Sequence, residues 1–274
     1  MVTHSGELVR TMREVLDALS WRDREAYNTA LKNMRFVLSS IVTSLSTMWK
    51  KSDAKNFARW RTFIMGTYNQ PMFPNGVVYE GVSSEPVQYR GASGAMDSLV
   101  PSIDNILQVT EMLPDNPLTE VLMDFRRYRP EPHNEFLEQL SERARANGGL
   151  VAFAKEDPLS LVYYLQNLDI IREFRMIHWN LTREFVFKYS AHPVATGGSP
   201  ILSWLPNQLL AVLSLSIEIS KEVDVSRLDP EHADIFEKLR KMTAAQDRVL
   251  KRELAAIQEK CDEAAMKAPL CKTE

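Results

Sequence analysis

Apolar side chains recur at spacings of three and four residues through most of this chain, most clearly over residues 8–21 and 27–48. Residues at that spacing share one face of an α-helix, which is buried against neighbouring elements. No alternating apolar and polar pattern exceeds four residues, and only 10 glycines and 14 prolines occur among 274 residues. The sequence therefore predicts an all-α fold that forms a single domain over residues 1–274.

Helix-start signals predict the other helices. Ser52 or Asp53 is a suitable cap for a third helix that runs toward residue 68. Asp157 followed by Pro158 is typical of the start of a long helix, which we expect to reach about residue 189. We expect the remaining helices to begin near residues 93, 118, 134, 200 and 230, with a kink or restart at Pro101.

The helical period breaks between residues 69 and 91, where prolines and glycines recur. The stretch is poorer in serine, glycine and charge than a flexible linker. We therefore expect an ordered loop that buries its apolar side chains, which are Met72, Phe73, Val77, Val78 and Tyr79.

Charge and composition exclude several classes of protein. The chain has 33 basic and 36 acidic residues, a formal charge of −3, so neither nucleic acid nor a membrane surface is expected as a partner. No apolar run approaches the roughly 18 residues of a membrane span. The two cysteines, Cys261 and Cys271, lie near the end and cannot form a disulfide framework. These features favour a cytoplasmic location.

His178 is the most informative single residue. Its neighbours one and two turns away on the expected helix are Ile171, Phe174, Leu181 and Phe185, so it projects from an apolar stripe. A core histidine bonded to a backbone carbonyl is one interpretation. An axial ligand of haem iron is the other, because a neutral imidazole on an apolar helix face suits that role. No partner spacing indicates a zinc site.

Arg61 presents a similar choice, since Phe57, Ile64 and Met65 share its helix face. A guanidinium among apolar groups needs an anion, which is either a structural carboxylate or the carboxylate of a ligand.

Two glycine-containing segments are weaker signals. Residues 91–95 could allow close approach of a ligand, and residues 196–198 could form a hinge. The basic cluster 126–129 is expected to be a solvated helix cap.

Read together, several segments resemble the large catalytic domain of the indoleamine 2,3-dioxygenase family. The last of them looks closest to fungal members. In chain order the matching segments are 57–66, Asn75-Gly76-Val77-Val78-Tyr79-Glu80-Gly81, Arg90-Gly91-Ala92-Ser93-Gly94-Ala95, Pro101-Ser102-Ile103-Asp104, Arg126-Arg127-Tyr128 with Pro130, Pro132 and His133, Arg175-Met176-Ile177-His178, Ala195-Thr196-Gly197-Gly198-Ser199 and Ser203-Trp204-Leu205-Pro206-Asn207-Gln208.

The resemblance implies a helical haem-binding domain with a role for each matching residue. His178 is implied as the proximal ligand of haem b, with Arg175 and Asp104 paired beside it. The implied substrate contacts are Arg61 on the carboxylate of L-tryptophan, Phe57 on the indole, Ser93, Gly94 and Ala95 on the distal side near a haem propionate, and Thr196 and Gly197 on a closing loop.

The implied reaction inserts both atoms of O2 across the indole C2–C3 bond of L-tryptophan, or of a related indole, to give N-formylkynurenine. It belongs to tryptophan catabolism and the kynurenine route to NAD, and it needs no acid or base from the protein. The family's small domain and an opening helix have no counterpart here, so the resemblance implies an N-terminally truncated large domain. Asn56 also replaces a pocket aromatic.

These departures leave three hypotheses. The first is a haem dioxygenase, for which we expect weak or absent turnover because water reaches the site. The second is a haem-binding paralogue or fragment with a regulatory or binding role. The third is a helical interaction module without a cofactor.

Overall fold

The computed structural model describes residues 2–113, 117–189, 195–198 and 201–267. Its α-helices, in chain order, are α1 Ser5–Trp21, α2 Arg24–Ser46, α3 Met48–Lys51, α4 Ala54–Arg61, α5 Leu99–Ile106, α6 Pro117–Asp124, α7 Glu131–Arg145, α8 Leu150–Lys155, α9 Pro158–Phe185, α10 Ile201–Ser220 and α11 Pro230–Lys267. Strand pairing within these residues is limited to an isolated bridge between Val77 and Val87. The all-α prediction is confirmed.

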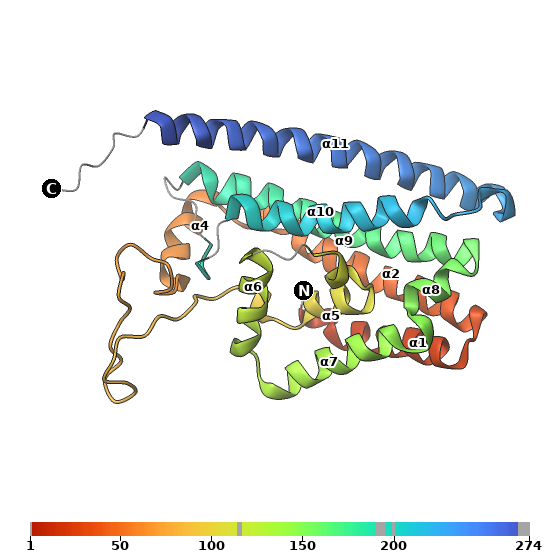
Figure 1. Ribbon diagram of the computed structural model, residues 1–274, viewed down its shortest axis with the longest axis horizontal. Helices are drawn as coiled ribbons and strands as arrows, with labels where there is room; N and C mark the ends of the chain where they lie inside the picture. Colours follow the sequence, from red (N-terminus) through yellow and green to blue (C-terminus); the bar gives the residue numbers. More distant parts are fainter. Residues whose placement is uncertain (1, 114–116, 190–194, 199–200, 268–274) are drawn as a thin grey trace.

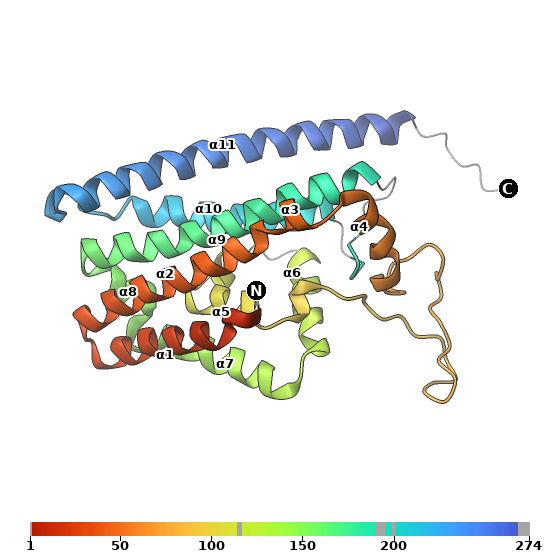
Figure 2. The same cartoon turned by 180° about the vertical axis from the view of Figure 1, so that it is seen from behind.

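Helix α9 lies at the centre and packs against α2, α4, α8, α10 and α11. Figures 1 and 2 show α11 along one side of the molecule and α1 and α2 on the side away from it, with α9 and α10 between. The core contains polar side chains that are satisfied internally. Tyr164 is fully buried and its hydroxyl donates to the carbonyl of Leu107 at 2.6 Å, and the Tyr27 hydroxyl donates to Leu150 at 3.0 Å.

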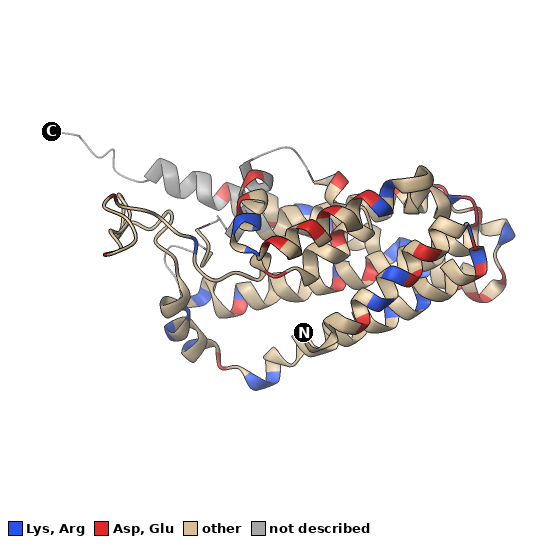
Figure 3. Ribbon diagram, turned by 90° about the horizontal axis from the view of Figure 1, so that it is seen from below, with Lys and Arg blue, Asp and Glu red and all other residues tan. Residues whose placement is uncertain are grey.

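Positions of Lys and Arg alternate with positions of Asp and Glu along the described helices (Figure 3). This arrangement is typical of solvated helix faces. Within the part of the chain that the structure describes, no helix combines the length and the hydropathy needed to cross a membrane. Cys271 lies outside this part, and the side chain of Cys261 is not described.

The predicted starts of two helices are confirmed by their capping bonds. Asp53 accepts from the amide of Asn56 at 2.8 Å, and Asp157 accepts from the amide of Ser160 at 2.8 Å, with Pro158 in the first turn of α9. Both helices end earlier in the sequence than predicted. Helix α4 ends at Arg61 and α9 ends at Phe185, each followed by a short 3-10 turn.

We expect Asp157→Ala to lower the free energy of unfolding by about 1 kcal/mol, because the amide of Ser160 loses its acceptor at the start of the central helix. Asp157→Asn keeps a capping oxygen and is the matched control, with an expected change of only a few tenths of a kcal/mol. Urea denaturation of the two variants measures the difference. Equal losses in both would show that the cap contributes nothing to stability.

The segment between Gly66 and Gly91 is an ordered loop, as predicted, but it projects from the helices (Figure 1). The expected burial of its apolar side chains is wrong in part, because Met72 is 80% exposed and Val78 is 52% exposed. Tyr79 is also exposed, and Phe73 and Val77 are half-buried. Prolines and glycines keep the chain away from the bundle, so these side chains have only the loop itself to pack against. The loop therefore carries an exposed apolar surface.

Candidate functional site

His178 on α9 is exposed to solvent, yet the surrounding protein desolvates it strongly. Desolvation lowers the pKa of His178 to about 4, and the nearby charge of Arg175 is a smaller cause. Two neighbours of His178 on the same helix, Phe174 and Ile177, are half-buried, so the accessible imidazole is flanked by apolar side chains. Its imidazole is neutral near pH 7, which is the form that binds a metal ion.

Aromatic side chains pack beside this part of α9. Phe57 on α4 meets Phe185 edge to face, with ring centroids 5.7 Å apart. Phe174 and Ile177, both half-buried on α9, pack against the same small cluster. The structure therefore brings Phe57 to the helix that carries His178, which the spacing within either helix could not predict.

One turn before His178, Arg175 forms a buried ion pair with Asp104 of α5. Nη2 of Arg175 contacts both carboxylate oxygens at 2.6 Å, and Nη1 donates to the carbonyl of Gln208 at 2.6 Å. Burial raises the pKa of Asp104, and the guanidinium opposes this rise. The pairing implied by the family resemblance is present and fixes α5 against α9; its role beside a cofactor stays a prediction.

The segment 91–95 and the turn 195–198 meet backbone to backbone. The amides of Gly66 and Gly91 both donate to the carbonyl of Thr196, at 3.1 and 3.2 Å. A Cβ added to Gly91 would lie 2.2 Å from the amide nitrogen of Gly66 and 2.4 Å from the Thr196 carbonyl oxygen. Gly197 is packed equally closely against the ring of Phe125. Glycine is required at these positions by close approach.

The side-chain hydroxyls of Ser93 and Thr196, which are predicted to contact substrate, form hydrogen bonds within these two segments. Thr196 donates to the carbonyl of Ala92 at 2.5 Å, and the Ser93 hydroxyl accepts from the amide of Ala95 at 3.2 Å. Gly94 differs from its neighbours, since a Cβ there would meet no atom within 4 Å. The segment therefore presents an open face at Gly94. Ser199 of the expected closing loop lies outside the described residues.

Arg61 is the last residue of α4 and is 9% exposed. Burial lowers the pKa of its guanidinium. The prediction that Arg61 lies among apolar groups is consistent with this burial, whereas Arg59 on the same helix is exposed. A contact between Arg61 and a substrate carboxylate remains a prediction.

The basic cluster 126–129 is not uniformly solvated, which corrects the prediction. Arg127 is exposed and pairs with Asp124, but Arg129 is 7% exposed and Nη2 donates to the carbonyl of Ala95 at 2.6 Å. The extended backbone after the 3-10 turn Phe125–Tyr128 directs Arg129 away from its neighbours. The burial of Arg129 could not be predicted, because the arginines next to it in the sequence suggest that all of them are solvated.

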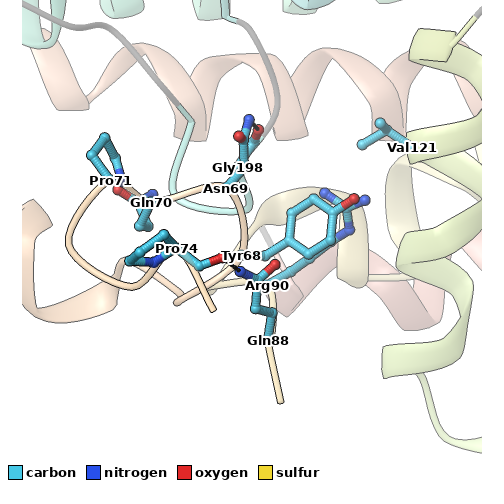
Figure 4. Close-up of a pocket in the computed structure, with 9 residues that line it drawn as sticks. All are labelled: Tyr68, Asn69, Gln70, Pro71, Pro74, Gln88, Arg90, Val121 and Gly198. Atoms are coloured by element: carbon cyan, nitrogen blue, oxygen red, sulfur yellow. Dashed lines mark hydrogen bonds between the residues drawn. The ribbon is translucent and has the colours of Figure 1, made fainter. Parts of the chain in front are cut away.

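A cavity of about 580 Å³ lies beneath the projecting loop (Figure 4). Arg90 forms one wall, where its guanidinium lies 4.1 Å from the Tyr68 ring centroid, contacts Asp124 and donates to the carbonyl of Gly197 at 2.8 Å. None of the residues that line the cavity belongs to α9. They are Tyr68, Asn69, Gln70, Pro71, Pro74, Gln88, Arg90, Val121 and Gly198. No pattern in the sequence indicates this cavity, because the residues that form its walls are distant in the chain.

Comparison with known proteins adds a family match. The model of the family described as "Indoleamine 2,3-dioxygenase" matches residues 1–202, which include α1 to α9 and the turn 195–198.

Among the described residues, no group of three or more His, Cys, Asp and Glu side chains is placed to hold a metal ion. A single protein ligand, as His178 offers, is compatible with the one axial contact that haem iron takes from a protein.

Three relatives show the range of likeness. Indoleamine 2,3-dioxygenase 2 of Mus musculus is 26% identical over 213 residues, which are 72% of this chain and 51% of that protein. A myoglobin of Haliotis diversicolor is 28% identical over 183 residues, 66% of this chain and 47% of that protein. Indoleamine 2,3-dioxygenase qulI of Penicillium citrinum is 23% identical over 249 residues, which are 84% of this chain and 55% of that protein. The chain spans about half the length of these relatives.

Proposed function

This chain belongs to the indoleamine 2,3-dioxygenase family, and from that premise we propose that it binds haem through His178 and acts as a haem-dependent dioxygenase on an indole. The observation that carries the proposal is the imidazole of His178, which is accessible, neutral near pH 7 and flanked by apolar side chains. The packing of Phe57 against the same helix and the buried Arg175–Asp104 pair support it.

The residues around His178 fit haem. An apolar helix face suits the porphyrin, and the neutral imidazole suits its iron. Arg175 and Asp104 hold α9 and α5 together one turn away, which would keep the imidazole in a constant position. In the segment 93–95, Gly94 leaves open space where any other residue would place a side chain.

The substrate we propose is L-tryptophan or a related indole, with O2 as the second substrate, haem b as the cofactor and N-formylkynurenine as the product. Haem supplies the oxygen chemistry when bound. This chain's own residues bind and orient: Arg61 holds the carboxylate, Phe57 contacts the indole, and the segment 93–95 with Thr196 and Gly197 encloses the reactants and excludes water. No proton transfer by a side chain is required.

A second candidate function is haem binding without catalysis. The observation that favours it is the likeness to a protein named myoglobin, at an identity similar to that of the dioxygenases. The exposure of His178 also favours it, because water that reaches the site promotes oxidation of the iron. For the chain in hand we therefore expect weak or absent turnover. The two functions share His178 and differ in the use of Arg61.

The first test is spectroscopic. We expect the protein reconstituted with haem, reduced and treated with carbon monoxide to show a shifted Soret band that is lost in His178→Ala. His133→Ala, an exposed histidine on α7, is the control and should leave the band unchanged. A band that persists in His178→Ala would overturn the assignment of His178 as the iron ligand, and no band in either protein would leave a helical module without this cofactor as the remaining interpretation.

The second test separates catalysis from binding. We expect Arg61→Ala to weaken L-tryptophan binding to the haem-loaded protein roughly tenfold to hundredfold, because a charge-assisted contact to the carboxylate is lost. Arg59→Ala, on the exposed side of the same helix, should leave binding unchanged. Formation of N-formylkynurenine under reductant, lost in Arg61→Ala, would support the dioxygenase. Haem binding with no product would support the second candidate.

A further inference from the structure

Arg129 is a buried cation with most of its hydrogen-bonding capacity unused. The side chain is 7% exposed, and its Nη2 donates to the carbonyl of Ala95 at 2.6 Å. Its Nε and Nη1 atoms are shielded from solvent and have no hydrogen-bond partner among the described residues. Because Nε carries one N–H group and Nη1 carries two, three of the five donors of this guanidinium have no acceptor.

Three other buried arginines in the described part of the chain each contact a carboxylate at 2.5 to 2.6 Å. These pairs are Arg90–Asp124, Arg172–Asp169 and Arg175–Asp104. The fold therefore normally supplies an internal carboxylate when it buries a guanidinium, and Arg129 departs from that rule.

The charges near Arg129 do not replace such a partner. Burial lowers its pKa, the neighbouring charge of Arg126 lowers it further, and Asp97 acts in the opposite direction. Asp97, however, accepts from the amide of Leu99 at 2.7 Å, where α5 begins. A buried cation whose only acceptor among the described residues is a neutral carbonyl is unfavourable in the free protein, and an anion that binds there relieves the penalty.

The position of Arg129 connects it to the candidate site. Among the described residues, its guanidinium bonds to the carbonyl of Ala95, which follows the open position at Gly94. Helix α5 begins at Leu99, four residues after Ala95, and Asp104 lies about 8 Å further along its axis, where it holds Arg175 one turn before His178. Arg129 is thus bonded to the segment that leads into the helix carrying this ion pair.

We propose that Arg129 is a carboxylate-binding residue, whose Nε–H and Nη1–H groups donate to a carboxylate of a ligand bound beside Ala95. This inference rests on the proposed function, which brings two carboxylate sources to the site. One is a propionate of haem, and the other is the carboxylate of the amino-acid substrate. A guanidinium offers a carboxylate several charge-assisted hydrogen bonds at once, whichever ligand carries it.

The test compares Arg129→Met with Arg127→Met, an exposed arginine two residues away that serves as the control. Each protein is titrated with metal-free protoporphyrin IX, with haem, and with the dimethyl esters of both, which lack the free carboxylates. The haem-loaded proteins are then titrated with L-tryptophan and with tryptamine, which lacks the carboxylate. Calorimetry and absorbance give the dissociation constants.

If a propionate is the partner, Arg129→Met should weaken binding of the free-acid porphyrins roughly tenfold to hundredfold and leave the diesters unchanged. If the amino acid is the partner, the same loss should appear for L-tryptophan and not for tryptamine. Arg127→Met should match the unsubstituted protein in every titration. The free Arg129→Met protein should melt at the same temperature as the unsubstituted protein or higher, because an unpaired buried charge has been removed.

Equal affinities of Arg129→Met and the unsubstituted protein for every ligand would overturn the inference, as would equal losses for acids and esters. If Arg129→Met fails to fold, the same titrations are made with Arg129→Lys. The unsubstituted protein should then bind the free-acid porphyrin more tightly than its diester if Arg129 contacts a propionate. The metal-free porphyrin keeps the two proposals apart. Metal-free porphyrin binds without an iron ligand. If Arg129→Met weakens its binding while haem gives no His178-dependent Soret band, the proposed function is rejected and the inference about Arg129 stands.

Discussion

Replacing Gly91 with alanine is expected to lower the free energy of unfolding by about 3 kcal/mol or more. The new Cβ would lie 2.2 to 2.4 Å from backbone atoms of Gly66, Ile64 and Thr196, and backbone atoms cannot rotate away as side chains do. The hydrogen bonds from Gly66 and Gly91 to the Thr196 carbonyl would break as the segments separate. Thermal and urea unfolding measure the loss.

Gly94→Ala is the matched control, because it adds the same methyl group three residues away where no atom lies within 4 Å. We expect its stability to stay within about 0.5 kcal/mol of the unsubstituted protein. A melting temperature for Gly91→Ala equal to that of Gly94→Ala would show that the three segments do not meet as the structure describes.

Replacing Asp104 with leucine is expected to cost about 3 to 5 kcal/mol, because the guanidinium of Arg175 is left buried without its carboxylate. A second substitution, Arg175→Met, removes the stranded charge and should restore most of the loss. Urea denaturation of the two single variants and the double variant gives the coupling energy.

The control is an exposed pair of the same residue types that also joins two helices. Asp17 on α1 contacts Arg143 on α7 at 2.8 Å, and both side chains are more than one third exposed. Asp17→Asn should change stability by no more than about 1 kcal/mol. If Asp104→Leu costs as little, or if Arg175→Met restores nothing, the buried pair does not contribute as argued.

The sequence predicted the features that depend on neighbouring residues. Caps at Asp53 and Asp157 and the periodic faces of the helices are set within one or two turns, so their signals are local. Helix ends were less accurate. Beyond the end of α4 at Arg61, the chain is held by a bond from Gly66 to Thr196, which are 130 residues apart and have no common pattern in the sequence.

The candidate site divides in the same way. His178 and Arg61 could be singled out because a polar residue interrupts an apolar face. The Arg175–Asp104 pair spans 71 residues and was expected only through the family resemblance. The burial of Arg129 had no signal, because Arg126 and Arg127 beside it in the chain suggested a solvated group. Sequence patterns identify which residues are unusual, whereas packing decides which partners they have.

The contacts between the turn 195–198 and the root of the projecting loop have a mechanical consequence. Thr196 accepts from Gly66 and Gly91, Gly198 accepts from Asn69 at 3.1 Å, and Gly197 accepts from Arg90. These bonds therefore couple any shift of the turn to the root of the loop. If a ligand displaces the turn, as the proposed function implies, a fluorophore attached at the exposed Val82 of the same loop would report its binding from a distance.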